Sequence, residues 1–187
     1  CMLQERYLNL SSILCNDSDV NEEGIEIGDP TEVALINYAE KYDVDYKSIR
    51  ENYTRISEIP FDSDRKLMTT VNLIDDENSM FTKGAPDVLL EKCVRQIGDT
   101  KNSTKILEKQ LIQRENLKMA EKALRVIAVA YKEVDNLPQN IDTKTIENNL
   151  VFVGLIGMID PPREGVKDAV ATCKKAGIKT VMITGDH

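Results

Sequence analysis

A change of hydrophobic period near Thr54 constrains the fold of this chain more than any other feature of its sequence. Upstream of it, apolar residues recur with helical spacing, whereas residues 54–82 alternate largely between apolar and polar side chains. A period of two is typical of strands that bury one face. The acidic run at 75–78 interrupts the alternation where a turn between two strands is expected. The sequence therefore predicts an antiparallel meander over residues 54–82.

Helices are predicted on both sides of the meander. The segment Gly28-Asp29-Pro30-Thr31-Glu32 marks a helix start, because proline is favoured in the first helical turn and acidic groups favour the positive end of the helix. Apolar residues at helical spacing predict helices over 2–15, 30–42, 46–52, 86–93 and 105–124. The side chains of the last helix that are expected to face inward are Ile106, Leu107, Leu111, Ile112, Leu117, Met119 and Ala123.

Two more strands complete the expected sheet. Apolar runs predict strands over 125–131 and 150–159. A polar loop is expected over 100–104, and an irregular connection with room for one helical turn over 135–149. The pattern indicates an α+β fold, α/β in part, in which helices flank a twisted antiparallel sheet.

The segment Asp160-Pro161-Pro162-Arg163 is predicted to be a hinge. Two successive prolines remove two backbone donors and fix both φ angles, so the chain leaves the sheet in a stiff, extended conformation. We therefore expect one domain over 1–159 and the beginning of another over 160–187. In this second part, a helix over 164–176 is followed by an apolar strand over 178–183, which is typical of a parallel α/β sheet.

The ends of the sequence suggest that it is a piece of a longer chain. It opens on Cys1-Met2-Leu3 with no initiator or signal peptide, and it stops directly after the predicted strand. No apolar run approaches the roughly 20 residues that span a bilayer. Four scattered cysteines and a single histidine, His187, predict neither a metal site nor disulfides, and indicate reduced thiols in a cytosolic setting.

The charge of the chain limits its partners. A formal net charge of -8 argues against binding nucleic acid, because phosphate backbones require clustered basic residues and are repelled by an acidic surface. A single small anion needs only a local basic patch. A nucleotide therefore remains a candidate ligand.

The predicted hairpin over 61–86 carries such a patch. An exposed aromatic ring stacks on a nucleic-acid base with about 1–3 kcal/mol, and Phe61 is the candidate ring. A lone phenylalanine in a strand is more often part of the core. However, Arg65, Lys66 and Lys83 would form a costly cluster of like charge without an anion or neighbouring acids. The hairpin therefore reads as a surface for a base with phosphates attached.

Three further sites each have a functional and a structural interpretation. Lys83-Gly84-Ala85-Pro86 places a cation and a close-approaching backbone before a helix start, which suits a phosphate but is also an ordinary strand-to-helix turn. Glu32 is able to accept a hydrogen bond from the adenine amino group, or only to favour the helix dipole. Thr184-Gly185-Asp186 follows the predicted parallel strand, where α/β folds place ligands, and its Asp either holds a metal-phosphate pair or caps a helix.

Several common catalytic patterns are absent from the sequence. It has no Gly-x-x-x-x-Gly-Lys-Ser/Thr loop and no Gly-x-Gly-x-x-Gly after a strand. It also lacks a His, Cys or Ser arrangement suited to nucleophilic catalysis. The residues alone thus predict an anion- or nucleotide-binding module with a hinge, and no catalytic or metal-binding residue.

Six motifs in this order resemble those of the P-type cation-transporting ATPases, over essentially the whole chain. They are Gly28 to Glu32, Phe61-Asp62-Ser63-Asp64-Arg65-Lys66-Leu67-Met68, Lys83 to Pro86, Leu124-Arg125, Asp160 to Arg163, and Thr184 to Asp186. The resemblance implies a nucleotide-binding domain through about Ile159. It implies that the remaining residues are a hinge and the first helix and strand of a haloacid-dehalogenase-like phosphorylation domain.

The resemblance also implies roles for single residues. Glu32 would contact the adenine amino group, Phe61 would stack on the ring, and Met68 would form an apolar wall. The residues implied near the base and phosphates are Arg65, Lys66, Lys83, Gly84 and Arg125, joined by Asp160, Arg163, Thr184, Gly185 and Asp186 from the hinge and phosphate side. Sarcoplasmic-reticulum-type calcium pumps carry Arg where this chain has Ser63, so one phosphate contact is expected to be absent or supplied by Arg65.

The family mechanism transfers the γ-phosphoryl group of ATP, with Mg²⁺, to an Asp in an Asp-Lys-Thr-Gly-Thr motif. That motif would lie upstream of Cys1, and the Gly-Asp-Gly-x-x-Asn-Asp segment beyond His187. The expectation is a chain that binds ATP without turnover. In the parent it would act with phosphorylation, actuator and membrane domains, at the cytoplasmic face of a bacterial plasma membrane.

The motifs look most like those of calcium pumps. A pump for Na⁺, H⁺ or Mn²⁺ is the nearest alternative, because ion ligands reside in membrane helices. A stand-alone nucleotide-binding regulatory module is the alternative from another class.

Overall fold

The alternating residues form an antiparallel meander in the computed structural model, which describes residues 2–98, 100, 103–159 and 165–181. Its strands are β3 (Arg55–Asp62), β4 (Leu67–Ile74) and β5 (Glu77–Gly84). The tight turn between β4 and β5 is made by Asp75 and Asp76, with φ angles of 50° and 68°. Asp tolerates this left-handed conformation, which matches the twist of the two strands. The predicted meander is therefore confirmed.

The meander is one edge of a seven-stranded sheet with the strand order β3-β4-β5-β8-β9-β6-β7. The other four strands are β8 (Arg125–Glu133), β9 (Leu150–Met158), β6 (Cys93–Ile97) and β7 (Thr104–Ile106). Of the described pairs in this sheet, β6 with β9 is parallel and the others are antiparallel. A separate small hairpin consists of β1 (Asp19–Val20) and β2 (Glu26–Ile27).

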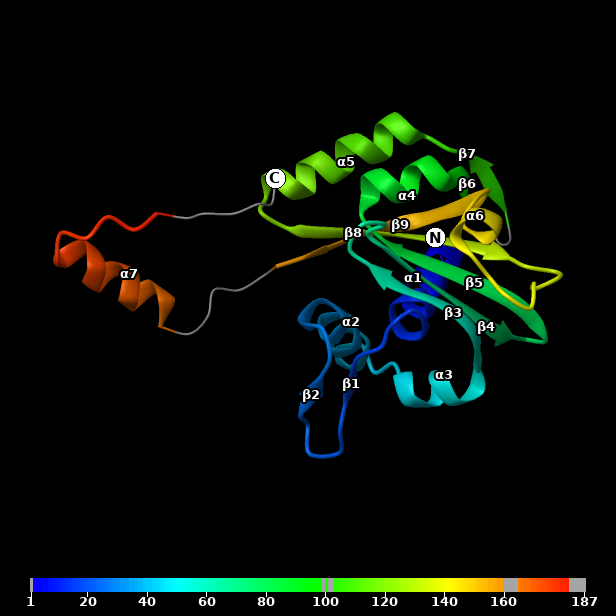
Figure 1. Cartoon of the computed structure of the whole chain (residues 1–187), viewed down its shortest axis with the longest axis horizontal. Helices are drawn as coiled ribbons and strands as arrows, with labels where there is room; N and C mark the ends of the chain where they lie inside the picture. The colour runs from blue at the N-terminus through cyan, green and yellow to red at the C-terminus, as the bar shows by residue number, and fades with distance from the viewer. Residues whose placement is uncertain (1, 99, 101–102, 160–164, 182–187) are drawn as a thin grey trace.

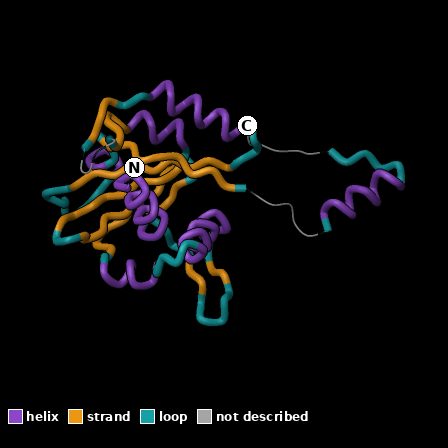
Figure 2. Tube along the Cα trace, turned by 180° about the vertical axis from the view of Figure 1, so that it is seen from behind, coloured by secondary structure: helices purple, strands orange, loops and turns teal. Residues whose placement is uncertain are grey.

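Helices cover both faces of the large sheet (Figures 1 and 2). One face packs against α1 (Met2–Leu14), α2 (Pro30–Lys41) and α3 (Tyr46–Asn52). The other face packs against α4 (Pro86–Lys92), α5 (Lys109–Glu121) and α6 (Thr143–Ile146). Successive residues of β4 point to opposite faces. Leu67 therefore packs in the core under α4, α5 and α6, and Met68 in the core under α1, α2 and α3. The predicted α+β class with a mostly antiparallel, helix-flanked sheet is confirmed.

The region after α4 differs from the prediction. Residues 93–97, assigned to no strand from the sequence, form β6, and residues 104–106 pair with it as β7 instead of starting a helix. The helix predicted over 105–124 is therefore the shorter α5. Ile112 is the residue that α5 buries. Four side chains expected to face inward are instead exposed, namely Ile106, Leu111, Leu117 and Ala123. Helical spacing identified the helix, but pairing with β6 set where it begins.

The predicted second part of the chain is described only as a helix and its flanks. This helix, α7 (Val166–Lys175), confirms the helix expected over 164–176, although its described side chains are exposed apart from the partly buried Cys173. Residues 178–181 do not form the predicted strand. A strand requires hydrogen bonds from a neighbouring strand, and none of the described strands pairs with this segment. Residues 160–163, 182–183 and 184–186 lie outside the described residues.

Within the described ranges, no helix has both the length and the apolar character required to cross a membrane.

Thiol reactivity tests the burial of the sheet. Cys93 is buried, and desolvation raises the pKa of its thiol to about 12. At pH 8 about one such thiol in 10⁴ is ionised, against about a quarter for an unperturbed cysteine. We therefore expect iodoacetamide to modify Cys173 in the native chain and to leave Cys93 and the buried Cys15 unmodified until urea unfolds it. Peptide mass spectrometry measures each thiol, and equal native rates for Cys93 and Cys173 would contradict this packing.

Candidate binding pocket

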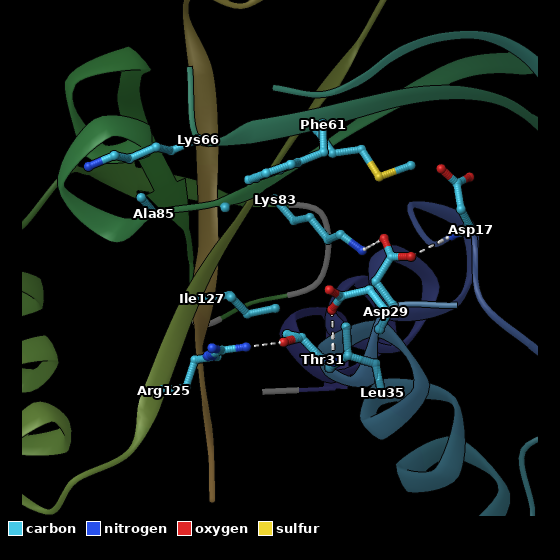
Figure 3. Close-up of a pocket in the computed structure, with 13 residues that line it drawn as sticks. Asp17, Asp29, Thr31, Leu35, Phe61, Lys66, Lys83, Ala85, Arg125 and Ile127 are labelled. Atoms are coloured by element: carbon cyan, nitrogen blue, oxygen red, sulfur yellow. Dashed lines mark hydrogen bonds and ion pairs between the residues drawn. The ribbon is translucent and has the colours of Figure 1, made fainter. Parts of the chain in front are cut away.

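A pocket of about 390 Å³ lies between the start of α2 and the adjoining face of the sheet (Figure 3). On the side of the sheet, residues of β3, the β3–β4 turn, β4, the end of β5 and the start of β8 line the pocket. Its lining residues are Asp17, Asp29, Thr31, Glu32, Leu35, Phe61, Lys66, Met68, Lys83, Gly84, Ala85, Arg125 and Ile127. The structure thus brings together seven of the residues predicted to bind nucleotide, although they come from four separate sequence motifs.

The pairing of β4 with β5 places two of these side chains side by side. Met68 lies opposite Lys83 in the register of the two strands, so both side chains point to the face covered by α2. Met68 is 1% exposed and Lys83 is 8% exposed. The thioether of Met68 contributes an apolar surface next to the aliphatic stem of Lys83. The floor of the pocket is therefore built by strand register rather than by a loop.

An ion pair joins this floor to α2. Nζ of Lys83 donates to Oε1 of Glu32 at 2.6 Å, and the two side chains are 10% and 15% exposed. The other carboxylate oxygen, Oε2, accepts the backbone N–H of Asp17 at 3.0 Å. The side-chain amide of Asn16 donates to the backbone carbonyl of Glu32 at 2.9 Å. Lys83 of β5 and the loop after α1 therefore hold the Glu32 carboxylate in the pocket, with its charge balanced by Lys83.

Phe61 lies at the edge of the pocket and is 61% exposed. The alternative that this phenylalanine is a core residue is therefore wrong. Its strand, β3, is an edge strand, and a register shift between Ile59 and Asp62 places an extra residue in β3 opposite β4. A bulge of this kind re-aims the side chains it contains. The ring is thus available to a flat ligand.

Gly84 allows the β3–β4 turn to close over the end of β5. Its φ angle is +153°, and a Cβ at this position would lie 2.1 Å from the carbonyl oxygen of Lys66. The same carbonyl accepts the backbone N–H of Ala85 at 3.1 Å. The Lys66 backbone has a φ of 60°, and its exposed side chain extends away from Lys83 (Figure 3). Glycine is required here by close backbone approach, and Lys66 is left at the rim.

Arg125 and Thr31 lie on the other side of the pocket. Nη1 of Arg125, at the start of β8, donates to Oγ1 of Thr31 at 2.6 Å (Figure 3). The helix start is fixed by Asp29, whose Oδ1 accepts the backbone N–H of Thr31 at 2.8 Å. Arg125 is exposed, so its guanidinium retains donors that face solvent. This leaves a second exposed cation in the pocket lining, at the start of β8.

The structure does not bring Arg65 into the pocket. Its side chain is 15% exposed, and its guanidinium pairs with Glu147 on the other face of the sheet, with Nη2 3.1 Å from Oε1. The sequence offered no sign of this pairing, because Glu147 lies in the polar connection before β9. Arg65 therefore does not line the pocket, and its contact with a nucleotide stays a prediction.

Several lining residues were not singled out from the sequence. Asp29, Thr31 and Ala85 belong to the motifs, and Ile127 follows Arg125 at the strand period, so local patterns were sufficient to find them. Asp17 and Leu35 had no such signal. The predicted residues Asp160, Pro161, Pro162, Arg163, Thr184, Gly185 and Asp186 lie outside the described part of the chain. In the described part, no group of three or more His, Cys, Asp or Glu side chains is arranged to hold a metal ion.

Comparison with known proteins identifies relatives of this chain. Residues 5–165 match the family described as P-type ATPase, cytoplasmic domain N. The chain is 49% identical to calcium-transporting ATPase 1 of Lactococcus lactis over 98% of the chain and 21% of that protein. It is 48% identical to a calcium-transporting ATPase of Listeria monocytogenes, again over 98% of the chain and 21% of the relative. It is 34% identical to the sodium/potassium exporting P-type ATPase cta3 of Schizosaccharomyces pombe, over 93% of the chain and 17% of that protein.

The ion pair in the floor of the pocket gives a stability prediction. Replacing Lys83 by Met retains an aliphatic stem but removes the ammonium from Glu32. We expect the free energy of unfolding to fall by about 1.5–3 kcal/mol, because a mostly buried carboxylate loses its charged hydrogen-bond donor. Urea unfolding followed by circular dichroism measures the loss. Lys66→Met, at the exposed rim, is the matched control with an expected change within about 0.5 kcal/mol. Equal losses in the two variants would rule out a stabilising ion pair.

Proposed function

This chain belongs to the P-type ATPases, as their cytoplasmic domain N, and we propose that its pocket binds ATP with the adenine ring stacked on Phe61. The observation that carries the proposal is an exposed aromatic ring at the mouth of a cavity whose inner end holds the Lys83–Glu32 pair. The cavity volume of about 390 Å³ is within the usual range for small-molecule sites. The chain spans about a fifth of the length of the two bacterial relatives described above, and binding ATP is proposed as its share of their activity.

The residues around the pocket suit the two halves of ATP differently. Leu35, Met68 and Ile127 supply apolar surface beside Phe61, which favours an aromatic base over a charged group. The carboxylate of Glu32 is an acceptor for the adenine amino group, since each of its oxygens has a further lone pair after the contacts described above. An acceptor here favours adenine over guanine, which presents a carbonyl at the same position.

The cations at the rim suit the phosphates. Lys66 and Arg125 are exposed residues of the pocket lining, and a polyphosphate attached to the base is proposed to emerge past them. Exposed cations bind phosphate without the desolvation cost that a buried cation would bear. ATP brings Mg²⁺ with it in this family, and Mg²⁺ neutralises charge on the phosphates. Asp186, from the Thr184-Gly185-Asp186 motif, is proposed to help hold this metal-phosphate pair.

The role of the whole protein follows from the family. We propose that the parent couples ATP hydrolysis, through an aspartyl phosphate formed elsewhere, to cation transport across a membrane, with this domain on the cytoplasmic side. The names of the bacterial relatives favour Ca²⁺, and that of the yeast relative keeps Na⁺ or K⁺ as the alternative. Residues 1–159 are proposed as the nucleotide-binding domain, and 160–187 as a hinge and part of the phosphorylation domain.

Removing the aromatic ring tests the proposed function. We expect the 187-residue chain to bind ATP with a Kd of roughly 0.1–1 mM. Phe61→Ala is expected to weaken binding about 5- to 150-fold, which corresponds to a stacking contribution of about 1–3 kcal/mol. An NMR titration with ATP measures both affinities. Tyr42→Ala is the matched control, because Tyr42 is also 61% exposed and does not line the pocket. An unchanged Kd in Phe61→Ala would exclude stacking on this ring.

Turnover is a separate expectation. Incubated with ATP and Mg²⁺, the chain is expected to form no acid-stable phosphoenzyme, because its sequence contains no Asp-Lys-Thr-Gly-Thr motif. Acid precipitation after labelling with γ-³²P-ATP measures this, with a full-length P-type ATPase as the positive control. Stable, hydroxylamine-sensitive label on the chain would show that an acceptor carboxylate lies within these residues.

A further inference from the structure

The backbone at Phe61 is held by few strand-pairing or packing contacts. Phe61 belongs to an edge strand, and the register passes from Ile59 opposite Thr69 directly to Asp62 opposite Leu67, so no partner on β4 is assigned to Pro60 or Phe61. Pro60 has no backbone N–H to donate. The ring itself is 61% exposed, so packing restrains it weakly. Something other than strand pairing or core packing is needed to fix its position.

Arg65 supplies that attachment. From the β3–β4 turn its guanidinium folds back beneath the strand, where Nη1 donates to the carbonyl of Pro60 at 3.1 Å and Nη2 to that of Ile59 at 3.4 Å. The turn itself is closed by Asp62, whose Oδ1 accepts the backbone N–H groups of Asp64 and Arg65 at 2.7 and 3.0 Å. Arg65 therefore holds the two residues that immediately precede Phe61.

Glu147 fixes the guanidinium in turn. Its side chain is 0% exposed, and Oε1 lies 3.1 Å from Nη2 of Arg65. The same oxygen accepts the hydroxyl of Thr69 at 2.7 Å, and Thr69 shares a 2.8 Å hydrogen bond with Thr82. Lys92 donates to the backbone carbonyl of Glu147 at 3.4 Å. Glu147 is thus anchored through its carboxylate to β4 and through its backbone carbonyl to α4, on the face of the sheet opposite the pocket.

Burial restricts the positions that the two side chains of this ion pair can adopt. A buried carboxylate requires compensation from charge and hydrogen bonds, and removing one partner leaves the other buried and unpaired. In the described structure Oε2 of Glu147 and Nε of Arg65 are buried without a hydrogen-bond partner. The contacts of Oε1 with Arg65 and Thr69 therefore provide the compensation for the carboxylate. Arg65 is consequently confined to one position, which also fixes the carbonyls of Ile59 and Pro60.

We propose that the Arg65–Glu147 ion pair positions Phe61 for stacking on the base, so that both are positioning residues of the nucleotide site although neither lines it. This inference rests on the proposed function. It assigns Glu147, from the connection before β9, to a site on the other face of the sheet, and it gives Arg65 a role in place of direct ligand contact.

A double-mutant cycle with Phe61 tests the proposal. Arg65→Met and Glu147→Gln are each expected to raise the Kd for ATP about three- to tenfold, a part of the stacking effect. In a Phe61→Ala background the same two substitutions are expected to leave the Kd unchanged, because no ring remains to be positioned. Arg6→Met, which removes an arginine from the exposed pair with Asp75, is the matched control and should match the parent chain. Glu147→Gln keeps an acceptor for Thr69 and carries the test if Arg65→Met does not fold.

The outcomes separate the two proposals. If the parent chain binds no ATP, the proposed function fails and the positioning role fails with it. If the parent binds ATP and both single variants bind equally well, the proposed function stands and the positioning role is wrong. A purely structural ion pair would lower the urea midpoint without changing the Kd of the folded chain, or would weaken binding equally with and without the Phe61 ring. Weakening that disappears in the Phe61→Ala background supports the proposal.

Discussion

The register between β4 and β5 is the constraint on which the rest of this structure depends. Met68 lies opposite Lys83, and Thr69 opposite Thr82. Because side chains alternate along a strand, the first pair points to the face covered by α2 and the second to the opposite face. A shift of one residue would exchange the two sets, bury the threonines beneath α2 and remove Lys83 from Glu32. The binding pocket and its support on the other face are therefore two consequences of one pairing.

Each face uses one largely buried ion pair to join segments that are distant in sequence. Lys83 with Glu32 joins the end of β5 to the first turn of α2, and Arg65 with Glu147 joins the β3–β4 turn to the link between α6 and β9. Ion pairs of this kind add little net stability compared with apolar residues, but they tolerate few alternative arrangements because an unpaired buried charge is costly. They are suited to holding segments in one fixed position. An exposed ring on a bulged edge strand has few other contacts that fix its position.

The sequence was sufficient to predict what depends on local pattern. The alternation through β3, β4 and β5, the start of α2 at Asp29 and Pro30, and the extent of α3 all follow from spacing and helix-capping chemistry. Pairing between distant segments was not predictable in this way. Residues 93–97 carry no alternation that distinguishes β6 from the end of α4, and residues 104–106 join the sheet only because β6 is there to receive them. The sequence also left open whether Phe61 was exposed, and gave no sign that Glu147 would draw Arg65 away from the pocket.

The most direct test of the central claim is a crystal structure of this chain with a non-hydrolysable ATP analogue. The predicted result is an adenine ring stacked on Phe61, with its amino group directed toward Glu32, its phosphates emerging past Lys66 and Arg125, and Arg65 still paired with Glu147. An analogue bound elsewhere, for example in the polar cavity beside Arg6 and Tyr131, or a base that makes no contact with the Phe61 ring, would contradict it.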